Sequence, residues 1–381
     1  LALSGGAFTT GTLFVGLGAI ASAGEAAGGV QSNDATSGVF DLTVTGGSHV
    51  IDYLSVDALV DASTGSFDAT GSGISGFARS GGANFLIDGG SLTVNSDIYN
   101  NFSTYGISPA DPADRIALTV RNSGVLTITG SFNANTQAYN GLDSIISTGG
   151  SISILTDNGT ITMGGLFLES SARPNSSFFF TAADEGRDFQ AGDISIVAQN
   201  GGAFTSGYSF LSARATGNDT NAGNGTGGNI FIHANNGSIN FTDFVGIDAS
   251  GIGGVGGTKD NPSSLGTGQG GAINLRVEGS GGALSFANLD INSDGSIAND
   301  GEGGAPSFEG DGGFGFGGAV TFDLLGGTFT ASDITIGSDG SGGGGGDQVT
   351  LSAAARAPSA TSQATPADLT VVNAPQAGGV S

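Results

Sequence analysis

The chain has 381 residues and a net charge of −25, because 34 acidic residues outnumber 9 basic ones. Glycine accounts for 73 residues, but only 8 prolines and no strict Gly-X-Y period accompany it, which excludes collagen. So acidic a surface repels nucleic acid and anionic membranes, and no apolar run is long enough to span a bilayer, so we expect neither nucleic acid as a partner nor a membrane-spanning segment.

A short phrase recurs nine times along the chain. It consists of Gly or Asn, then Gly, then a small or polar residue followed by alternating apolar residues. The nine turns contain Gly6, Gly47, Gly90, Gly124, Gly159, Gly202, Gly237, Gly282 and Gly327, at steps of 34 to 45 residues. A tight turn followed by two short strands, repeated down a whole chain, is typical of a solenoid of stacked β-coils.

The coil that begins at Gly228 shows the alternation most clearly. A third strand precedes the turn, so each coil is predicted to contain three strands around a triangular interior. The side chains expected to point inward in this coil are Ile230, Ile232, Ile239, Phe241, Val245 and Ile247. We therefore predict an all-β fold, a parallel β-helix of right-handed sense with about nine three-stranded coils, for residues 1–352.

The variable part of each coil follows the third strand. Gly-rich inserts at 251–271, 299–318 and 337–347 are therefore predicted to leave one edge of the rod as loops. Residues 353–381 lose the periodicity and read as a linker or an extended terminal arm. The apolar stretch 12–24 has some features of a signal peptide, but residues 5–21 repeat the phrase at 201–217 and so indicate a coil.

The alternative to a structural rod is a polysaccharide-active β-helix: a lyase, a glycoside hydrolase or a phage tailspike. Polygalacturonase-like enzymes carry Asn-Thr-Asp, Asp-Asp and Arg-x-Lys motifs, and this sequence contains none of them. Its two histidines, His49 and His233, lie in strand patterns, which favours structural positions. We therefore expect no enzymatic activity, with the polysaccharide-active protein as the second hypothesis.

Calcium is the only cofactor that the sequence suggests. Oxygen-rich loops can bind this ion, and the carboxylates in such loops are Asp290, Asp294, Asp300, Asp339 and Asp347. The stretch 342–350 also fits the nonapeptide that binds calcium in parallel β-rolls. A Gly-rich loop before a strand that starts at Asp347 is the interpretation that we favour for this stretch.

Some aromatic residues lie in the predicted loops. They are Phe178, Phe179, Phe314 and Phe316. Either these rings pack back onto the rod, or they anchor lateral contacts with another chain, since exposed apolar groups mark interfaces.

Phrases such as GGNIFIHANNGSINFTDFVGIDASG and GGSISILTDNGTITMGGLFLESSA resemble the filamentous-haemagglutinin-like exoproteins and autotransporter passengers of Gram-negative bacteria. The resemblance covers residues 5–351 and is one of repeat style. It implies a protein that is exported and acts outside the cell or on its surface, in adhesion, filaments or biofilm matrix. It also implies self-association, end to end or side by side, and a host or matrix glycan or protein as a partner.

Overall fold

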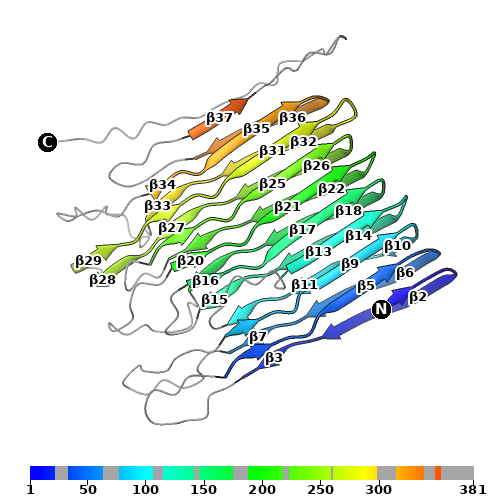
Figure 1. The fold of residues 1–381 in the computed structure, drawn as a ribbon, viewed down its shortest axis with the longest axis horizontal. Helices are drawn as coiled ribbons and strands as arrows, with labels where there is room; N and C mark the ends of the chain where they lie inside the picture. The colour runs from blue at the N-terminus through cyan, green and yellow to red at the C-terminus, as the bar shows by residue number, and fades with distance from the viewer. Residues whose placement is uncertain are drawn as a thin grey trace.

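In the computed structural model the described residues form strands and turns, with no helix. These residues are 1–21, 33–62, 77–105, 115–140, 146–174, 188–217, 223–258, 261–297, 315–338 and 348–352. Within them all strand pairs are parallel except one short antiparallel pair, and strands stack in chain order (Figure 1). The predicted fold class, an all-β parallel solenoid, is thus confirmed.

Sheet A consists of the strand that precedes each turn, together with one strand beyond the ninth turn. Its members are β1 (Ala2–Leu3), β5 (Phe40–Val44), β9 (Ala83–Asp88), β13 (Arg115–Arg121), β17 (Ser151–Asp157), β21 (Ile194–Gln199), β25 (Ile230–Asn235), β31 (Ile273–Glu278), β35 (Ala319–Leu325) and β37 (Gln348–Ser352). Each pairs with its neighbours in register, so equivalent residues form columns along the stacking axis.

Sheet B consists of the long strand that follows each turn. Its members are β2 (Ala7–Gly16), β6 (Ser48–Asp57), β10 (Ser91–Val94), β11 (Ile98–Asn101), β14 (Val125–Asn135), β18 (Thr160–Glu169), β22 (Ala203–Ser212), β26 (Ser238–Asp248), β32 (Ala283–Asn292) and β36 (Thr328–Gly337). Only β10 and β11 are separate strands within one coil, and both lie between β6 and β14.

The triangular interior predicted from the sequence is wrong, because the second and third strands of a coil belong to one sheet. The expected corner between them is a bulge: β26 has one more residue than β22 between its inward positions, and the register shifts there. The coil is therefore flat. A ten-residue strand extends about 33 Å and nine coils stack to about 43 Å, so the main core between sheets A and B is nearly as wide as it is tall.

Sheets A and B face each other across the main core. Phe85 of β9 meets Phe132 of β14 at a ring-centroid distance of 6.0 Å, and Phe322 of β35 meets Phe329 of β36 at 5.6 Å. All of the side chains predicted to point inward in the coil at Gly228 are at most 1% exposed. The period-two alternation thus identified the core residues correctly.

The turns that join sheet A to sheet B require left-handed backbone. Every one of the nine turns contains a residue with positive φ, for example Asn158 at 49°, Asn236 at 50° and Gly201 at 82°. Asn and Gly adopt this conformation most readily, which explains the recurring phrase.

Beyond the main core each coil continues into narrower sheets. Sheet C comprises β3 (Ala19–Ile20), β7 (Val60–Asp61), β12 (Thr104–Tyr105), β15 (Ala138–Asn140), β19 (Ala172–Pro174), β23 (Ala215–Thr216), β27 (Gly251–Gly253) and β33 (Gly295–Ile297). Sheet D comprises β16 (Ile146–Thr148), β20 (Asp188–Gln190), β24 (Gly225–Thr226), β30 (Gly268–Gln269) and β34 (Gly315–Phe316). A small pair, β4 (Ala35–Thr36) with β8 (Ala78–Arg79), completes the parallel strands.

The two layers touch where the chain enters sheet A. We call this line the glycine seam and define it by Gly192, Gly228, Gly271 and Gly318. Their backbone N–H groups donate across the layers to carbonyl oxygens at the end of sheet B, at 2.7–2.8 Å. A Cβ at Gly228, Gly271 or Gly318 would overlap the carbonyl oxygen of the seam residue in the preceding coil, and a Cβ at Gly192 would overlap that of Gly150. Only glycine therefore fits on this line.

Most of the variation in coil length lies in the chain between sheet C and the return to sheet A, although the turn that contains Gly282 is also two residues longer than the turn that contains Gly237. The insert at 251–271 is largely described, and it contains the antiparallel pair β28 (Val255–Thr258) and β29 (Asn261–Leu265). Most of the insert at 299–318, the loop at 339–347 and the tail at 353–381 lie outside the described residues. The handedness of the coil stays a prediction.

Candidate functional site

Carboxylates on the solenoid surface are paired with amides of the neighbouring coil. Asn84 donates to Asp41 at 2.8 Å, and the side chain of Asn200 donates to Asp157 at the same distance. Equivalent pairs join Asn95 to Asp52, Asn101 to Asp57 and Asn122 to Asp88. In the registered strand pairs of the described residues, no carboxylate lies directly opposite another.

This pairing explains how so acidic a chain can stack its coils. Residues opposite each other in neighbouring coils are about 4.8 Å apart, and like charges at that distance destabilise a sheet. An asparagine between them supplies a hydrogen-bond donor without a charge. At Asp88 the bonds from Asn122 and then from Arg121 lower the pKa of the carboxyl below its ordinary value.

The predicted calcium ligands do not form a cluster in the described part of the chain. Asp290 is exposed on the outer face of β32, whereas Asp294 lies at the corner that follows this strand, where its N–H donates to Asn292 at 3.0 Å. Asp300, Asp339 and Asp347 lie outside the described residues. Among the residues that the structure describes, no group of three or more acidic or histidine side chains could hold a metal ion.

The hydrogen bond from the Asp294 N–H to Asn292 has equivalents in other coils, at the corner where the chain passes from sheet B to sheet C. Asn101, Asn135 and Asp248 accept a backbone N–H from the residue two positions later, at distances from 2.9 to 3.4 Å. Such Asx turns redirect the chain, so the spacing of acidic and amide residues that suggested calcium has a structural cause here.

Of the aromatic residues predicted to mediate interactions, only Phe316 is described. It lies in β34 of sheet D, opposite Gln269, and its side chain is 42% exposed. Phe178, Phe179 and Phe314 lie outside the described residues. The prediction that these four rings mediate interactions therefore stays a prediction.

A larger set of exposed aromatic side chains lies on the outer face of sheet B, and the sequence analysis missed it. Four of them occupy a single register column, which we call the aromatic column: Phe14, Tyr99, Phe167 and Phe210. Their exposed fractions range from 36% for Phe167 to 73% for Phe14. The sequence contains one outward aromatic residue in each of several strands of sheet B. That these residues line up can be recognised only when the register between the strands is known.

Neighbouring rings support the aromatic column. Phe14 lies 5.9 Å from Tyr53, and Phe167 lies 5.9 Å from Tyr208, measured between ring centroids. Tyr208 in turn stacks on Phe244 at 5.6 Å. The outer face of sheet B thus carries a continuous aromatic surface across β18, β22 and β26.

A polar cluster borders this surface where sheet B meets sheet C. Arg173 donates to the hydroxyl of Tyr139 at 3.0 Å and lies over its ring, and Tyr139 stacks on Tyr105. Gln137 donates to Glu169, yet burial outweighs this bond and the nearby Arg173 and raises the pKa of the Glu169 carboxyl.

A second charged cluster lies on the outer face of sheet A. Arg276 donates to Glu278 at 2.9 Å, and His233 Nε2 lies 3.4 Å from the same carboxylate. Burial, followed by the charge of Arg276, lowers the pKa of His233. His49, by contrast, is buried in the main core, where its Nε2 contacts the Gly46 carbonyl oxygen at 2.7 Å. Both histidines therefore occupy strand positions, as predicted.

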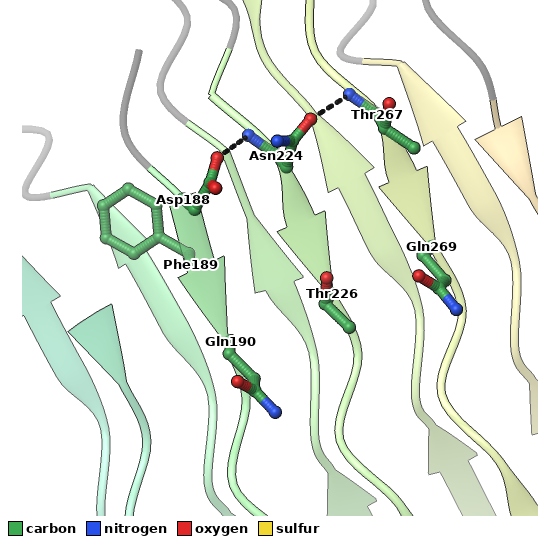
Figure 2. A pocket seen from close by; sticks show the side chains of 7 residues that line it. All are labelled: Asp188, Phe189, Gln190, Asn224, Thr226, Thr267 and Gln269. Carbon is green, nitrogen blue, oxygen red and sulfur yellow. Dashed lines mark hydrogen bonds between the residues drawn. The ribbon is translucent and has the colours of Figure 1, made fainter. Parts of the chain in front are cut away.

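A shallow hollow of about 300 Å³ lies on sheet D (Figure 2). Asp188 accepts the N–H of Asn224 at 2.8 Å, and the Asn224 side-chain oxygen accepts the N–H of Thr267 at 2.7 Å. Gln190, Thr226 and Gln269 line the hollow, and among its described lining residues Asp188 carries the only charged side chain.

Both terminal coils of sheet B pair on one side only within the described residues: β2 with β6, and β36 with β32. Inward residues of β2, including Phe8 and Leu13, are only partly buried, whereas the equivalent Leu54 of β6 is fully buried. Within the described residues, the outer edges of β2 and β36 thus have no strand partner, and such edges invite pairing with another strand.

Comparison with known proteins adds no relative: no family model, no curated protein and no solved structure matches this chain. The described residues contain no helix that is long and apolar enough to cross a membrane. The resemblance to exported β-helix proteins therefore stays a prediction.

Proposed function

We propose that the protein is a structural and adhesive component of the cell surface or the extracellular matrix, and that its chains stack end to end into a filament. The observation that carries this proposal is the match between the two terminal strands of sheet B. β2 and β36 each have ten residues and occupy the same register columns. One chain can thus continue the solenoid of the next.

The match extends to individual side chains. Continuing the register places Phe8 opposite Phe329 and Leu13 opposite Ile334, which extends the apolar core across the junction. Asp333 falls opposite Thr12, so the junction keeps the rule that carboxylates do not face each other. Such a head-to-tail contact does not close on itself and generates a filament.

The terminal strands of sheet A fall in the same row of such a junction. β1 occupies the columns of Thr43 and Val44, and β37 ends in the column of Thr43. Both strands reach that column, so the end of β37 must leave the row before β1 of the next chain can continue sheet A. A strand added in this way contributes backbone hydrogen bonds, which do not depend on charge.

Light scattering on the purified chain, over a range of concentrations in moderate salt, tests the proposal. We expect the mass to rise with concentration and Leu13→Lys to abolish the rise, because it places a charge on the inward side of the open coil. Thr12→Lys is the matched control, since it adds the same charge on the exposed side of the same strand. A chain that stays monomeric under all these conditions would contradict end-to-end assembly.

A further inference from the structure

The aromatic column on sheet B is regular along the stacking axis. Phe14, Tyr99 and Phe167 are separated from one another by the polar residues Ser55 and Asn133. Successive rings of these three are therefore two coils apart, about 9.6 Å. This is comparable to the length of two pyranose rings in an extended polysaccharide. Phe210 continues the column in the next coil.

Stabilisation of sheet B explains the positions of only some of the rings in the aromatic column. The ring of Phe210 lies so close to Gly246 that a Cβ there would come within 2.8 Å of it, and the ring of Phe167 comes within 3.3 Å of a Cβ on Gly165. Aromatic side chains that cover strand glycines stabilise a sheet. Phe14, however, is 73% exposed. Exposed rings in a line on a flat face are typical of a binding surface rather than of packing.

Charge restricts what this face can bind. The strands of sheet B contain no Lys or Arg, while Asp57, Glu169, Asp243 and Asp290 lie on their outer side. An anionic polysaccharide or a second acidic copy of the chain would be repelled here. A neutral sugar chain carries no charge, and its hydroxyl groups can donate to carboxylates and amides.

Polar side chains that suit a sugar chain flank the aromatic column. The neighbouring column consists of Asp57, Asn101, Asn135, Glu169, Ser212, Asp248 and Asn292, all at least partly exposed except the buried Ser212. In the same register column as the rings, Gly246 lies against the ring of Phe210, and Asp290 follows Gly246 in the next coil. The exposed carboxylate of Asp290, suggested from the sequence as a calcium ligand, is thus placed to accept a sugar hydroxyl.

We propose that the outer face of sheet B binds a neutral, extended polysaccharide, which lies along the stacking axis on the rings of Phe14, Tyr99, Phe167 and Phe210. This proposal specifies which class of molecule the adhesive protein proposed above would bind, and it rests on that adhesive role. It does not require end-to-end assembly. Apolar faces of the pyranose rings cover the aromatic rings, and the hydroxyl groups reach the flanking polar column.

Affinity electrophoresis in native gels tests the proposal with defined polymers. The neutral probes are hydroxyethyl cellulose, galactomannan, xylan and dextran, and the anionic probe is polygalacturonate. We expect at least one extended neutral polymer to retard the chain and polygalacturonate to leave it unretarded. The double variant Phe167→Ala/Phe210→Ala should weaken binding by about tenfold or more, as expected for truncation of central aromatic contacts.

Two further variants keep the outcomes distinct. Phe316→Ala removes an aromatic side chain of similar exposure outside the column and should leave binding unchanged. Leu13→Lys should abolish assembly yet keep polysaccharide binding, so the two proposals can fail separately. Circular dichroism verifies that each variant is folded; if the double variant unfolds, Tyr99→Ala replaces it, with the same expected direction. Retardation by none of the neutral polymers, or equal loss in Phe316→Ala, would overturn the inference.

Discussion

The two ends of each coil use glycine for different reasons. At the turn between sheets A and B the backbone adopts positive φ. Gly201, with a φ of 82°, has space around it, because a Cβ there would meet no atom within 4 Å, whereas at Gly47 and Gly327, which also have positive φ, a Cβ would overlap a carbonyl oxygen of the preceding coil. At the glycine seam the backbone does not adopt positive φ but is crowded, because a Cβ on Gly228 would overlap the Gly192 carbonyl oxygen. Glycine is thus needed at the turn for conformation, at some turn positions also for space, and at the seam for space alone.

The same contrast explains where the coils differ in length. The turn end sets the register of sheets A and B, and a slip by one residue there would turn every side chain to the wrong face. Beyond the seam the chain passes through the narrow sheets C and D, and most of the variation in coil length arises there, whereas the turns differ by at most two residues. One end therefore preserves the core, while the other absorbs insertions.

The largest expected effect comes from Gly228→Ala. The added methyl group must displace the backbone of the preceding coil, so we expect a loss of about 4 kcal/mol or more in the free energy of unfolding. Gly201→Ala, the matched change at the turn, meets no neighbour and should cost only about 1–2 kcal/mol through backbone strain. Urea denaturation measures both. Equal losses would remove the distinction between the two ends.

Insertions should show the opposite dependence on position. Four Gly/Ser residues placed between Asn236 and Gly237 interrupt the turn, and we expect a loss of about 2 kcal/mol or more. The same insert placed within residues 218–222 only lengthens a connection and should cost less than about 1 kcal/mol. Thermal unfolding followed by circular dichroism compares the two. A larger loss at 218–222 would contradict the assignment of register to the turn.

Asn200→Asp tests the pairing of carboxylates with amides at the turn end. The substitution replaces a donor 2.8 Å from Asp157 by a second carboxylate. We expect a loss of about 1 kcal/mol at neutral pH, which shrinks in high salt and in acid, where the carboxylates are screened or protonated. Asn200→Gly removes the same bond without adding charge and keeps the positive φ. Its loss should not depend on salt.

The smallest effect concerns His233 on sheet A. Burial and Arg276 lower its pKa below the ordinary 6.5, so the unfolded chain binds this proton more readily. The contribution to stability is complete above about pH 6.5 and falls as the pH drops from there to the lowered pKa. Glu169, whose pKa is raised, acts in the opposite direction at pH values above its ordinary 4.5.

The comparison of His233→Gln with the unmodified chain isolates the histidine. Between pH 7.5 and 5.5 the variant should lose less stability than the unmodified chain, as measured by urea denaturation at each pH. Parallel pH profiles for the two proteins would show that His233 does not contribute.

The sequence predicted what depends on neighbouring residues. Asn-Gly and Gly-Gly pairs, with Asn-Ser-Gly at the fourth turn, located the nine turns, since positive φ is a property of one or two residues. The alternation around Ile230 and Ile239 identified the inward faces. Features that depend on contacts between different coils could not be predicted from the sequence. The prediction of a triangular coil was wrong because the bulge in β26 can be recognised only by comparison with the register of β22.

The candidate sites depend even more than the fold on contacts between coils, which the sequence does not reveal. The sequence did not distinguish the glycines of the seam from the many other glycines, because their close neighbours lie one coil away in the chain. The aromatic column draws one residue from each of several coils whose lengths differ, so no fixed spacing reveals it. Conversely, Asp290 and Asp294 are close in sequence but lie on different parts of the coil, one on a strand face and the other at a corner.

Cryo-electron microscopy of the assembled protein tests the central claim most directly. Chains stacked end to end predict filaments of uniform width in which β2 of one chain lies about 4.8 Å from β36 of the next, with Phe8 opposite Phe329. Filaments in which the chains meet side by side through sheet B or sheet D, or fields of isolated blocks at every concentration, would contradict it.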